Sequence, residues 1–126
     1  MNSNHLFIIV LLGLSFSILC ITADADSIYT SALEGPFGDQ LKCTVTNVTN
    51  NPVQVTVTMY DDSGNIFNGP GTTTIDPKHV VSIFVTVNSD TLYFCKFNTQ
   101  NKLDIRANAF LIDSKDSRII AVVTAK

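Results

Sequence analysis

Hydrophobic and polar residues alternate along much of the chain beyond residue 40. The clearest example is the segment PVQVTVTMY at residues 52–60, where Val53, Val55 and Val57 alternate with polar residues. Because successive side chains of a β-strand point to opposite faces, this pattern predicts a strand with one buried face and one hydrated face. The segments QLKCTVTNV (40–48) and HVVSIFVTV (79–87) show the same alternation. They predict two more strands of this kind.

Val, Ile, Phe and Thr also dominate the remaining segments, and these residues fit a pleated, partly buried surface. Further strands are predicted at residues 92–98, 102–112 and 118–125, with an edge strand at 28–33 that ends at Glu34-Gly35-Pro36. Asn, Asp, Gly and Pro mark turns between the strands. The turn segments are 50–52, 61–65, 68–71, 76–77, 88–90 and 113–116. With no long stretch of helical spacing, the sequence predicts one all-β sandwich of about seven to eight antiparallel strands.

The first 25 residues predict a signal peptide. Residues 6–21 (LFIIVLLGLSFSILCI) are sixteen residues without a charge, which is typical of a signal-peptide hydrophobic region and short for a membrane span. Ala23 and Ala25 supply the small residues that signal peptidase accepts, which predicts cleavage before Asp26, with cleavage before Asp24 as the second choice. The first five residues contain no Lys or Arg, and no basic stop-transfer cluster follows that would distinguish a retained anchor from a removed leader, so a leader retained as an anchor stays open as the alternative. A signal peptide predicts a secreted or periplasmic protein. Its removal leaves one domain of about 101 residues, 26–126.

The three cysteines predict one disulfide. Cys20 lies in the leader, and the bulky Leu19 before it does not fit the lipoprotein acylation pattern. Removal of the leader leaves Cys43 and Cys95, an even number in a short exported chain, and an oxidising compartment pairs such cysteines. The bridge spans 52 positions, which in the loop-entropy description stabilises the fold by about 4 kcal/mol. The alternative, a reactive thiol pair, would be expected in a CxxC spacing, which the sequence lacks.

The charge pattern argues against two classes of partner. Eight basic and ten acidic side chains remain after the leader is removed, which gives a net charge near −2. The basic residues are scattered singly, whereas nucleic-acid binding requires a basic stripe or cluster. The sequence also contains no polybasic amphipathic helix of the kind that holds a protein on a membrane surface. We therefore expect no nucleic-acid partner and no stable membrane association after cleavage.

The residues around the two cysteines resemble those of immunoglobulin-like sandwiches. LKCTV (41–45) is similar to the second strand of such domains, and Tyr93-Phe94-Cys95 is similar to the Tyr-x-Cys of their later strand. The Val/Thr-rich run between them is similar to bacterial secreted members of this class. The resemblance implies that the bridge joins the two sheets and that the Tyr93 hydroxyl anchors a corner. The chain contains no Trp, so the buried Trp of antibody domains is absent and the resemblance is generic.

No group of residues forms a recognisable catalytic, cofactor or metal motif. His79 is the one histidine after the leader. A metal site or a hydrolytic triad needs several partner residues, and none can be identified for His79, so we expect it to be a surface residue in a turn. The loop 61–65 begins as a calcium loop does, but the sixth and twelfth positions of that loop are Ile and Thr, which do not fit. Asn47-Val48-Thr49 matches the N-glycosylation sequon. No cofactor is predicted.

Aromatic side chains are predicted on the outer faces of the strands, opposite the core. These candidates for a partner surface are Tyr60, Phe84, Phe94 and Phe110. The alternative is that another strand, the N-terminal segment or a second copy of the chain covers them. The function predicted first is a non-catalytic module that binds or scaffolds an unknown protein or glycan partner. The alternatives are a small exported enzyme or enzyme inhibitor with active residues on loops, and a subunit that completes itself by strand pairing at its Thr/Val-rich edges.

Overall fold

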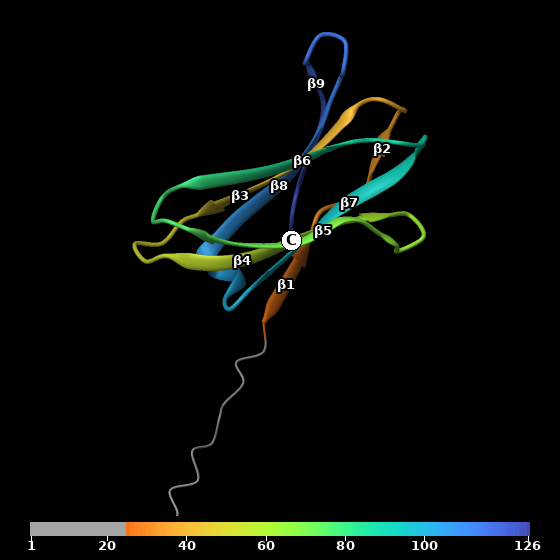
Figure 1. The fold of residues 1–126 in the computed structure, drawn as a ribbon. Helices are drawn as coiled ribbons and strands as arrows, with labels where there is room; N and C mark the ends of the chain where they lie inside the picture. Colours follow the sequence, from red (N-terminus) through yellow and green to blue (C-terminus); the bar gives the residue numbers. More distant parts are fainter. Residues whose placement is uncertain (1–24) are drawn as a thin grey trace, which may run out of the picture.

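A computed structural model describes residues 25–126, in which nine β-strands and one 3-10 turn (η1, Lys102–Asp104) form two antiparallel sheets (Figure 1). Sheet A contains β1 (Asp26–Tyr29), β2 (Leu33–Gly35), β4 (Val53–Asp61), β5 (Ile66–Ile75) and β7 (Thr91–Thr99). Sheet B contains β3 (Gln40–Asn47), β6 (Val80–Thr86), β8 (Ile105–Ile112) and β9 (Ile119–Thr124). The strand orders are β1-β7-β4-β5, with β2 also paired to β7, and β6-β3-β8-β9. The predicted all-β sandwich is confirmed, with one or two strands more than expected.

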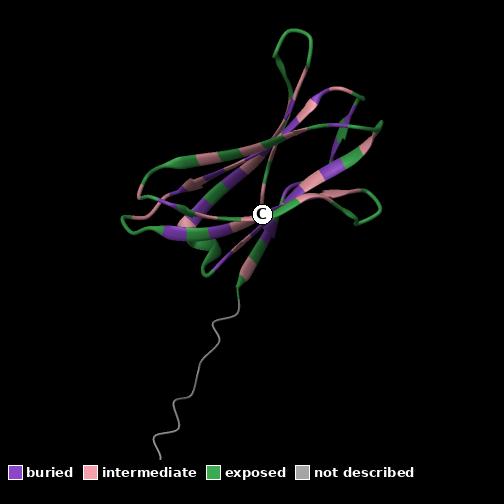
Figure 2. Cartoon of the chain, in the orientation of Figure 1, coloured by how far each residue is buried: buried purple, intermediate pink, exposed green. Residues whose placement is uncertain are grey.

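Along the strands, apolar residues are buried and the polar residues between them are exposed or partly exposed, so burial alternates as the sequence does (Figure 2). On β3, Leu41, Cys43 and Val45 are buried, whereas the residues between them are partly exposed. On β4, Val55 and Val57 are likewise buried against the opposite sheet. Each strand of this type contributes its apolar face to one core between the sheets, which is the physical reason that the two-residue period specifies the sandwich.

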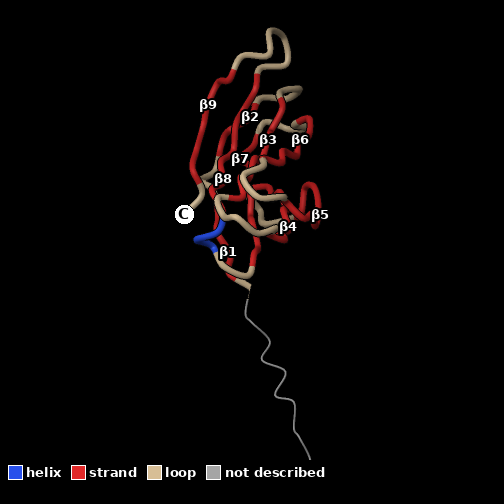
Figure 3. Tube along the Cα trace, turned by 90° about the vertical axis from the view of Figure 1, so that its left-hand side faces the viewer, coloured by secondary structure: helices blue, strands red, loops and turns tan. Residues whose placement is uncertain are grey.

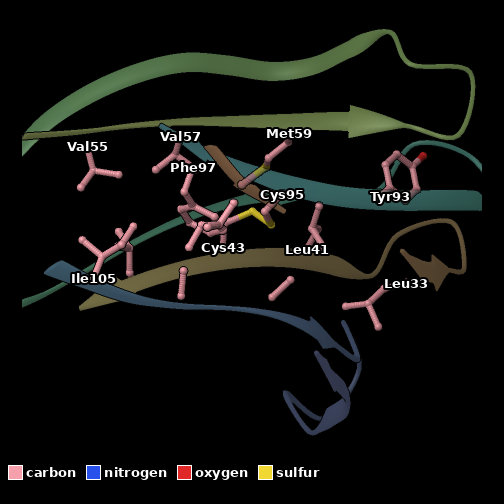
Figure 4. Close-up of a cluster of buried hydrophobic side chains, with 14 of the residues drawn as sticks. Leu33, Leu41, Cys43, Val55, Val57, Met59, Tyr93, Cys95, Phe97 and Ile105 are labelled. Carbon is pink, nitrogen blue, oxygen red and sulfur yellow. A yellow bond between two sulfur atoms is a disulfide. The ribbon is translucent and has the colours of Figure 1, made fainter. Parts of the chain in front are cut away.

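The predicted disulfide between Cys43 and Cys95 is confirmed, and it joins β3 to β7 across the core (Figure 4). The two Cα atoms are 6.1 Å apart, a separation that suits a disulfide. Both cysteines are buried, and Figure 4 shows Met59, Phe97 and Leu41 around them. Since β3 and β7 are inner strands of their sheets, the bridge connects the two layers near the middle of the core. A disulfide of this kind is typical of proteins that fold in an oxidising compartment.

The Tyr93 side chain anchors a corner through its hydroxyl, as the immunoglobulin resemblance implied. Its ring is buried, and the hydroxyl donates to the Ser89 carbonyl at 3.1 Å and lies 2.8 Å from the Ser89 Oγ. The tyrosine corner of immunoglobulin domains has this hydrogen bond to backbone a few residues upstream. The bond fixes the turn that enters β7 at the end of the sandwich opposite to η1.

The strand that follows the Tyr-x-Cys strand lies in the other sheet. β8 pairs with β3 along its whole length, from Gln40↔Ile112 to Asn47↔Ile105. In immunoglobulin domains the Tyr-x-Cys strand and the strand that follows it lie in the same sheet. The chain therefore shares the inter-sheet bridge and the corner with those domains, and differs from them in the placement of β8 and β9.

Three local predictions were wrong. The segment 68–71 is not a turn but part of β5, which continues through Gly69, Pro70 and Gly71 with two register shifts against β4. Residues 102–104 form η1, so the strand begins at Ile105. The edge strand expected at 28–33 is divided into β1 and β2. β2 includes Glu34 and Gly35, two of the residues at which the sequence predicts the end of that edge strand.

The two sheets meet along one margin, where β1 approaches the end of the chain after β9. The Tyr29 and Lys126 backbones exchange hydrogen bonds, with N···O distances of 3.3 and 3.0 Å. Figure 3 shows β9 at the outer side of this margin and β5 and β6 at the opposite side. Among residues 25–126 no helix is long and apolar enough to cross a membrane. The signal-peptide prediction lies outside the described residues, apart from Ala25.

Candidate functional site

The four predicted surface aromatics lie on two opposite faces of the molecule. Tyr60 on β4 and Phe94 on β7 are on the outer face of sheet A, whereas Phe84 on β6 and Phe110 on β8 are on the outer face of sheet B. Phe84 is 65% exposed, and the other three are partly buried. They therefore form two separate surfaces.

On sheet A the aromatic side chains are in direct contact with one another. Tyr60 and Phe94 are register partners, and their rings stack at a centroid distance of 5.2 Å with an angle of 12° between the planes. Tyr29 from β1 joins them, with its ring centroid 6.5 Å from that of Phe94, and the Lys96 Nζ lies 5.5 Å from the Tyr29 centroid. We call these four residues the sheet A cluster. It spans the three strands β1, β7 and β4.

The sheet A cluster continues into exposed aliphatic residues. Leu92, on the same face of β7 as Phe94, is 41% exposed, and Ile66, the register partner of Tyr60, is 55% exposed. Tyr29 itself is 45% exposed. Aromatic and aliphatic groups on a hydrated sheet face, with a cation–π contact at one side, form an amphipathic surface of the kind that is enriched at protein interfaces.

Sequence reasoning missed Tyr29, because the segment before residue 40 lacks a clear alternation. Ile28 is buried and Tyr29 is exposed, so a two-residue period does exist there, but it covers only the four residues of β1. The cation–π contact depends on the pairing of β1 with β7, which puts Tyr29 opposite Lys96. That pairing joins segments more than sixty residues apart, and no local pattern reports it.

On sheet B the exposed apolar residues form a row across four strands. Phe84, Lys42, Phe110 and Val122 are successive register partners on β6, β3, β8 and β9. Val122 is 51% exposed. The row lies on the face that points away from sheet A, and Lys42 is its one charged member.

A cleft of about 400 Å³ lies at the margin between β2 and β9. It is lined by Glu34, Gly35, Pro36, Asp90, Leu111 and Ile120. Asp90 Oδ1 accepts a hydrogen bond from the Phe37 backbone N–H at 2.6 Å, so this carboxylate holds the loop between β2 and β3. The lining has no histidine, cysteine or hydroxyl side chain that would serve as a nucleophile.

His79 lies in the turn between β5 and β6, away from the cleft. Its side chain is exposed, and its Nδ1 is 3.0 Å from the Pro77 carbonyl oxygen, which it contacts within the same turn. Within the described part of the chain, no three His, Cys, Asp or Glu side chains gather closely enough to hold a metal ion.

The Asp61 carboxylate forms its hydrogen bonds within its own turn. Oδ1 accepts hydrogen bonds from the backbone N–H groups of Ser63 and Asn65 at 3.0 and 2.8 Å, and Oδ2 accepts one from the Asn65 side-chain amide at 3.1 Å. These bonds, led by that from the Asn65 side chain, hold the pKa of Asp61 below its ordinary value. The carboxylate thus caps the hairpin between β4 and β5.

Asn47, the sequon asparagine, is completely buried. Its Nδ2 donates to the carbonyls of Asn51 and Ile75 at 2.7 and 2.9 Å, and its Oδ1 accepts from the Thr49 N–H and hydroxyl at 2.8 and 2.9 Å. All the hydrogen-bonding capacity of the amide nitrogen is used. The side chain ties the end of β3 to the β3–β4 turn and to the end of β5, which leaves no room for a glycan in the folded domain.

The comparisons with known proteins bear on the fold only. No protein-family model matches the chain, and a search of curated proteins finds none similar in sequence. Among solved structures, the fold is similar to that described as "Crystal Structure of Thermotoga maritima 1070", with a TM-score of 0.59. The alignment covers 81% of this chain and 93% of that chain at 8% sequence identity. At this identity the similarity shows a common arrangement of strands and carries no information on function.

Proposed function

We propose that this chain is an exported, non-catalytic binding module of the immunoglobulin-like type, and that its partner is a protein that contacts the sheet A cluster. The observation that carries the proposal is the contact of three aromatic rings and one lysine on an otherwise hydrated sheet face. Tyrosine and phenylalanine offer a large contact area with few rotatable bonds, which is why they are enriched where proteins bind one another.

A protein fits the sheet A cluster better than a glycan does. Sugar rings bind by stacking on free aromatic faces, but Tyr60 and Phe94 stack on each other and Lys96 lies over one face of Tyr29. Tyr29 and the neighbouring Leu92 are 45% and 41% exposed. These groups suit a partner surface with mixed apolar and hydrogen-bonding character.

Export is supported by two features of the described residues. The inter-sheet disulfide is typical of oxidising compartments. The first strand begins at Asp26, the residue that the predicted cleavage makes the new N-terminus, and its Oδ2 accepts a hydrogen bond from the Lys102 backbone N–H at 3.1 Å. Cleavage there would leave every strand of the sandwich intact. The mass of the protein recovered after export tests this step, because cleavage at another position changes that mass.

Site-specific photo-crosslinking tests the partner surface. A benzoylphenylalanine in place of Phe94 reports contacts of the sheet A cluster, and the same group in place of Thr74, which is exposed on the outer face of β5, is the matched control. We expect an adduct with one protein of the native extracellular milieu from position 94 and none from position 74. Equal adducts from both positions, or selective binding to a glycan array, would contradict the proposal. Turnover in a hydrolase substrate panel would contradict its non-catalytic part.

A further inference from the structure

We propose that the free edge of β6 pairs with β6 of a second copy of this chain, which joins two sheet B layers into one continuous antiparallel sheet. This inference concerns sheet B and is independent of the proposed partner on sheet A. It rests on the backbone groups of β6, on the absence of charge along that strand, and on the state of the other sheet edges.

The hydrogen-bonding direction of β6 follows from its two ends. The Asn47 N–H donates to the His79 carbonyl, and the Val87 N–H donates to the Asp39 carbonyl, so 79 and 87 are positions whose backbone faces β3. Since antiparallel ladders alternate, the backbone groups of residues 81, 83 and 85 also face β3. The N–H and C=O groups of residues 80, 82, 84 and 86 therefore point to the free edge.

These edge groups are complementary to themselves. In an antiparallel pair centred on residue 83, Ser82 of one copy lies opposite Phe84 of the other, and Val80 lies opposite Thr86. All four edge-facing residues of each copy then find a hydrogen-bonding partner, in a closed pair with two-fold symmetry. The large Phe84 side chain, 65% exposed in the single chain, meets the small Ser82 rather than another large group.

Charge and burial both favour this pairing. Residues 80–89 contain no charged side chain, so no like charges meet across the axis. The nearest charged residues are Lys78 before the strand and Asp90 after it, and antiparallel pairing brings these opposite charges to the same end of the interface. The inward-facing Val81, Ile83 and Val85 are only partly buried in the single chain, and a strand at this edge would cover them.

The other edges of the described sheets have features that hinder pairing over part or all of their length. β5 contains Gly69 and Pro70 and has two register shifts, and β1 and β2 are separated by a break in the strand. β9 has a register shift near its start, and the residues after it bond to Tyr29. Proline, bulges and short strands are the devices by which proteins protect sheet edges, and β6 has none of them.

The mass of the exported, disulfide-bonded protein in solution, measured by light scattering over a wide concentration range, tests the inference. We expect twice the chain mass, and we expect the variant Ser82→Pro to halve it. Proline at this position removes an edge-facing N–H and leaves the hydrogen bonds to β3 in place. The matched control is Phe84→Ser, which removes the exposed ring but keeps every edge-facing backbone group, and which we expect to remain a dimer.

Backbone hydrogen exchange in the unmodified protein gives a second measurement that does not depend on a variant folding. The Ser82 and Phe84 amides should exchange more than about tenfold more slowly at high than at low protein concentration. A single-chain mass at all concentrations would overturn the inference. So would a dimer that survives Ser82→Pro, a dimer lost equally in Phe84→Ser, or protection of these amides only when a different protein is added, which would identify a foreign strand as the occupant.

Discussion

Replacement of Asn47 by alanine is expected to destabilise the domain by about 3 kcal/mol. The side chain is completely buried and forms four hydrogen bonds. Its bond to the Ile75 carbonyl is buried, and loss of that partner leaves an unsatisfied acceptor at a cost of about 1–3 kcal/mol. The three other bonds are partly buried at the β3–β4 turn, where water replaces part of each, so they add about 0.5 kcal/mol apiece.

Urea unfolding of the disulfide-bonded protein measures this loss. The chain has three Tyr and no Trp, so tyrosine fluorescence together with far-ultraviolet circular dichroism reports the transition. Asn108→Ala is the matched control, because Asn108 is only partly buried on the outer face of β8, and it should change the free energy of unfolding by less than about 0.5 kcal/mol.

Asn47→Asp separates the loss of the amide from the loss of volume. The carboxylate has nearly the same shape but cannot donate to the Asn51 and Ile75 carbonyls, and burial raises its pKa above the unfolded value. The penalty relative to the parent protein should therefore be complete above the folded pKa of the new carboxyl and should shrink as the pH falls towards its unfolded pKa. A cost for Asn47→Ala no greater than that for Asn108→Ala would refute the assignment of Asn47 as the residue that holds the turn.

Tyr93→Phe removes the corner hydroxyl and should destabilise the domain by about 1 kcal/mol, whereas Tyr60→Phe should change the free energy of unfolding by less than about 0.5 kcal/mol in the same urea assay. Reduction of the disulfide, maintained by excess reductant without an alkylating agent, should lower the free energy of unfolding by about 4 kcal/mol, seen as a lower urea midpoint. Nuclear magnetic resonance should show a pKa of the Asp61 carboxyl below its ordinary value of 3.8. The stabilising effect of this carboxylate is therefore complete at pH values above the ordinary pKa and is lost as the pH falls through the folded pKa. Asn65→Ala should raise the folded pKa, because it removes the side-chain hydrogen bond. Folded protein secreted by a glycosylating host should carry no glycan on Asn47, which mass spectrometry will show.

The strands were predictable where one face is completely covered. Val55 and Leu41 lie on inner strands, so an apolar residue at every second position appears directly in the sequence, and the two cysteines fall on the inward positions of such strands. The same alternation on β6 predicted Val81 and Ile83 as core residues, yet both are only partly buried because β6 is at the edge of its sheet. Position within the sheet depends on pairing between distant segments, which a two-residue period does not encode.

The error at residues 68–71 arose from local turn chemistry that serves another purpose here. Gly and Pro favour turns, but proline is also tolerated on an edge strand, where its missing N–H has no ladder partner to lose. β5 is such a strand. Gly69 has a positive φ of 98°, and a Cβ there would lie 2.8 Å from the Val57 carbonyl oxygen, so the glycine permits a close approach of β5 to β4.

The candidate surface was predictable residue by residue but not as a surface. Alternation predicts Tyr60, Phe84, Phe94 and Phe110 on the faces opposite the core, and in the structure Phe84 is exposed and the other three are partly exposed. It did not separate the pair on sheet A from the pair on sheet B. The sheet that each strand joins depends on where the chain crosses between the layers, and alternation within a strand does not report that crossing. The sequence identifies Asn47 only as part of a sequon for a related reason, since its burial depends on the position of Ile75 at the end of β5.

The two proposed surfaces have a geometric consequence when they occur together. Opposed residues of an antiparallel pair point to the same face, so a dimer through β6 has its two-fold axis perpendicular to the joined sheet and buries the inward residues of both copies on the same side. Both copies of sheet A then lie on that side, with Tyr60 and Phe94 of each directed away from the joined sheet. A dimer would present two sheet A clusters in one direction, and a partner with repeated sites, or one fixed on a surface, would bind it more tightly than the single chain without any new contact. Ser82→Pro should therefore weaken binding to an immobilised partner while the affinity for a monovalent fragment of that partner stays unchanged.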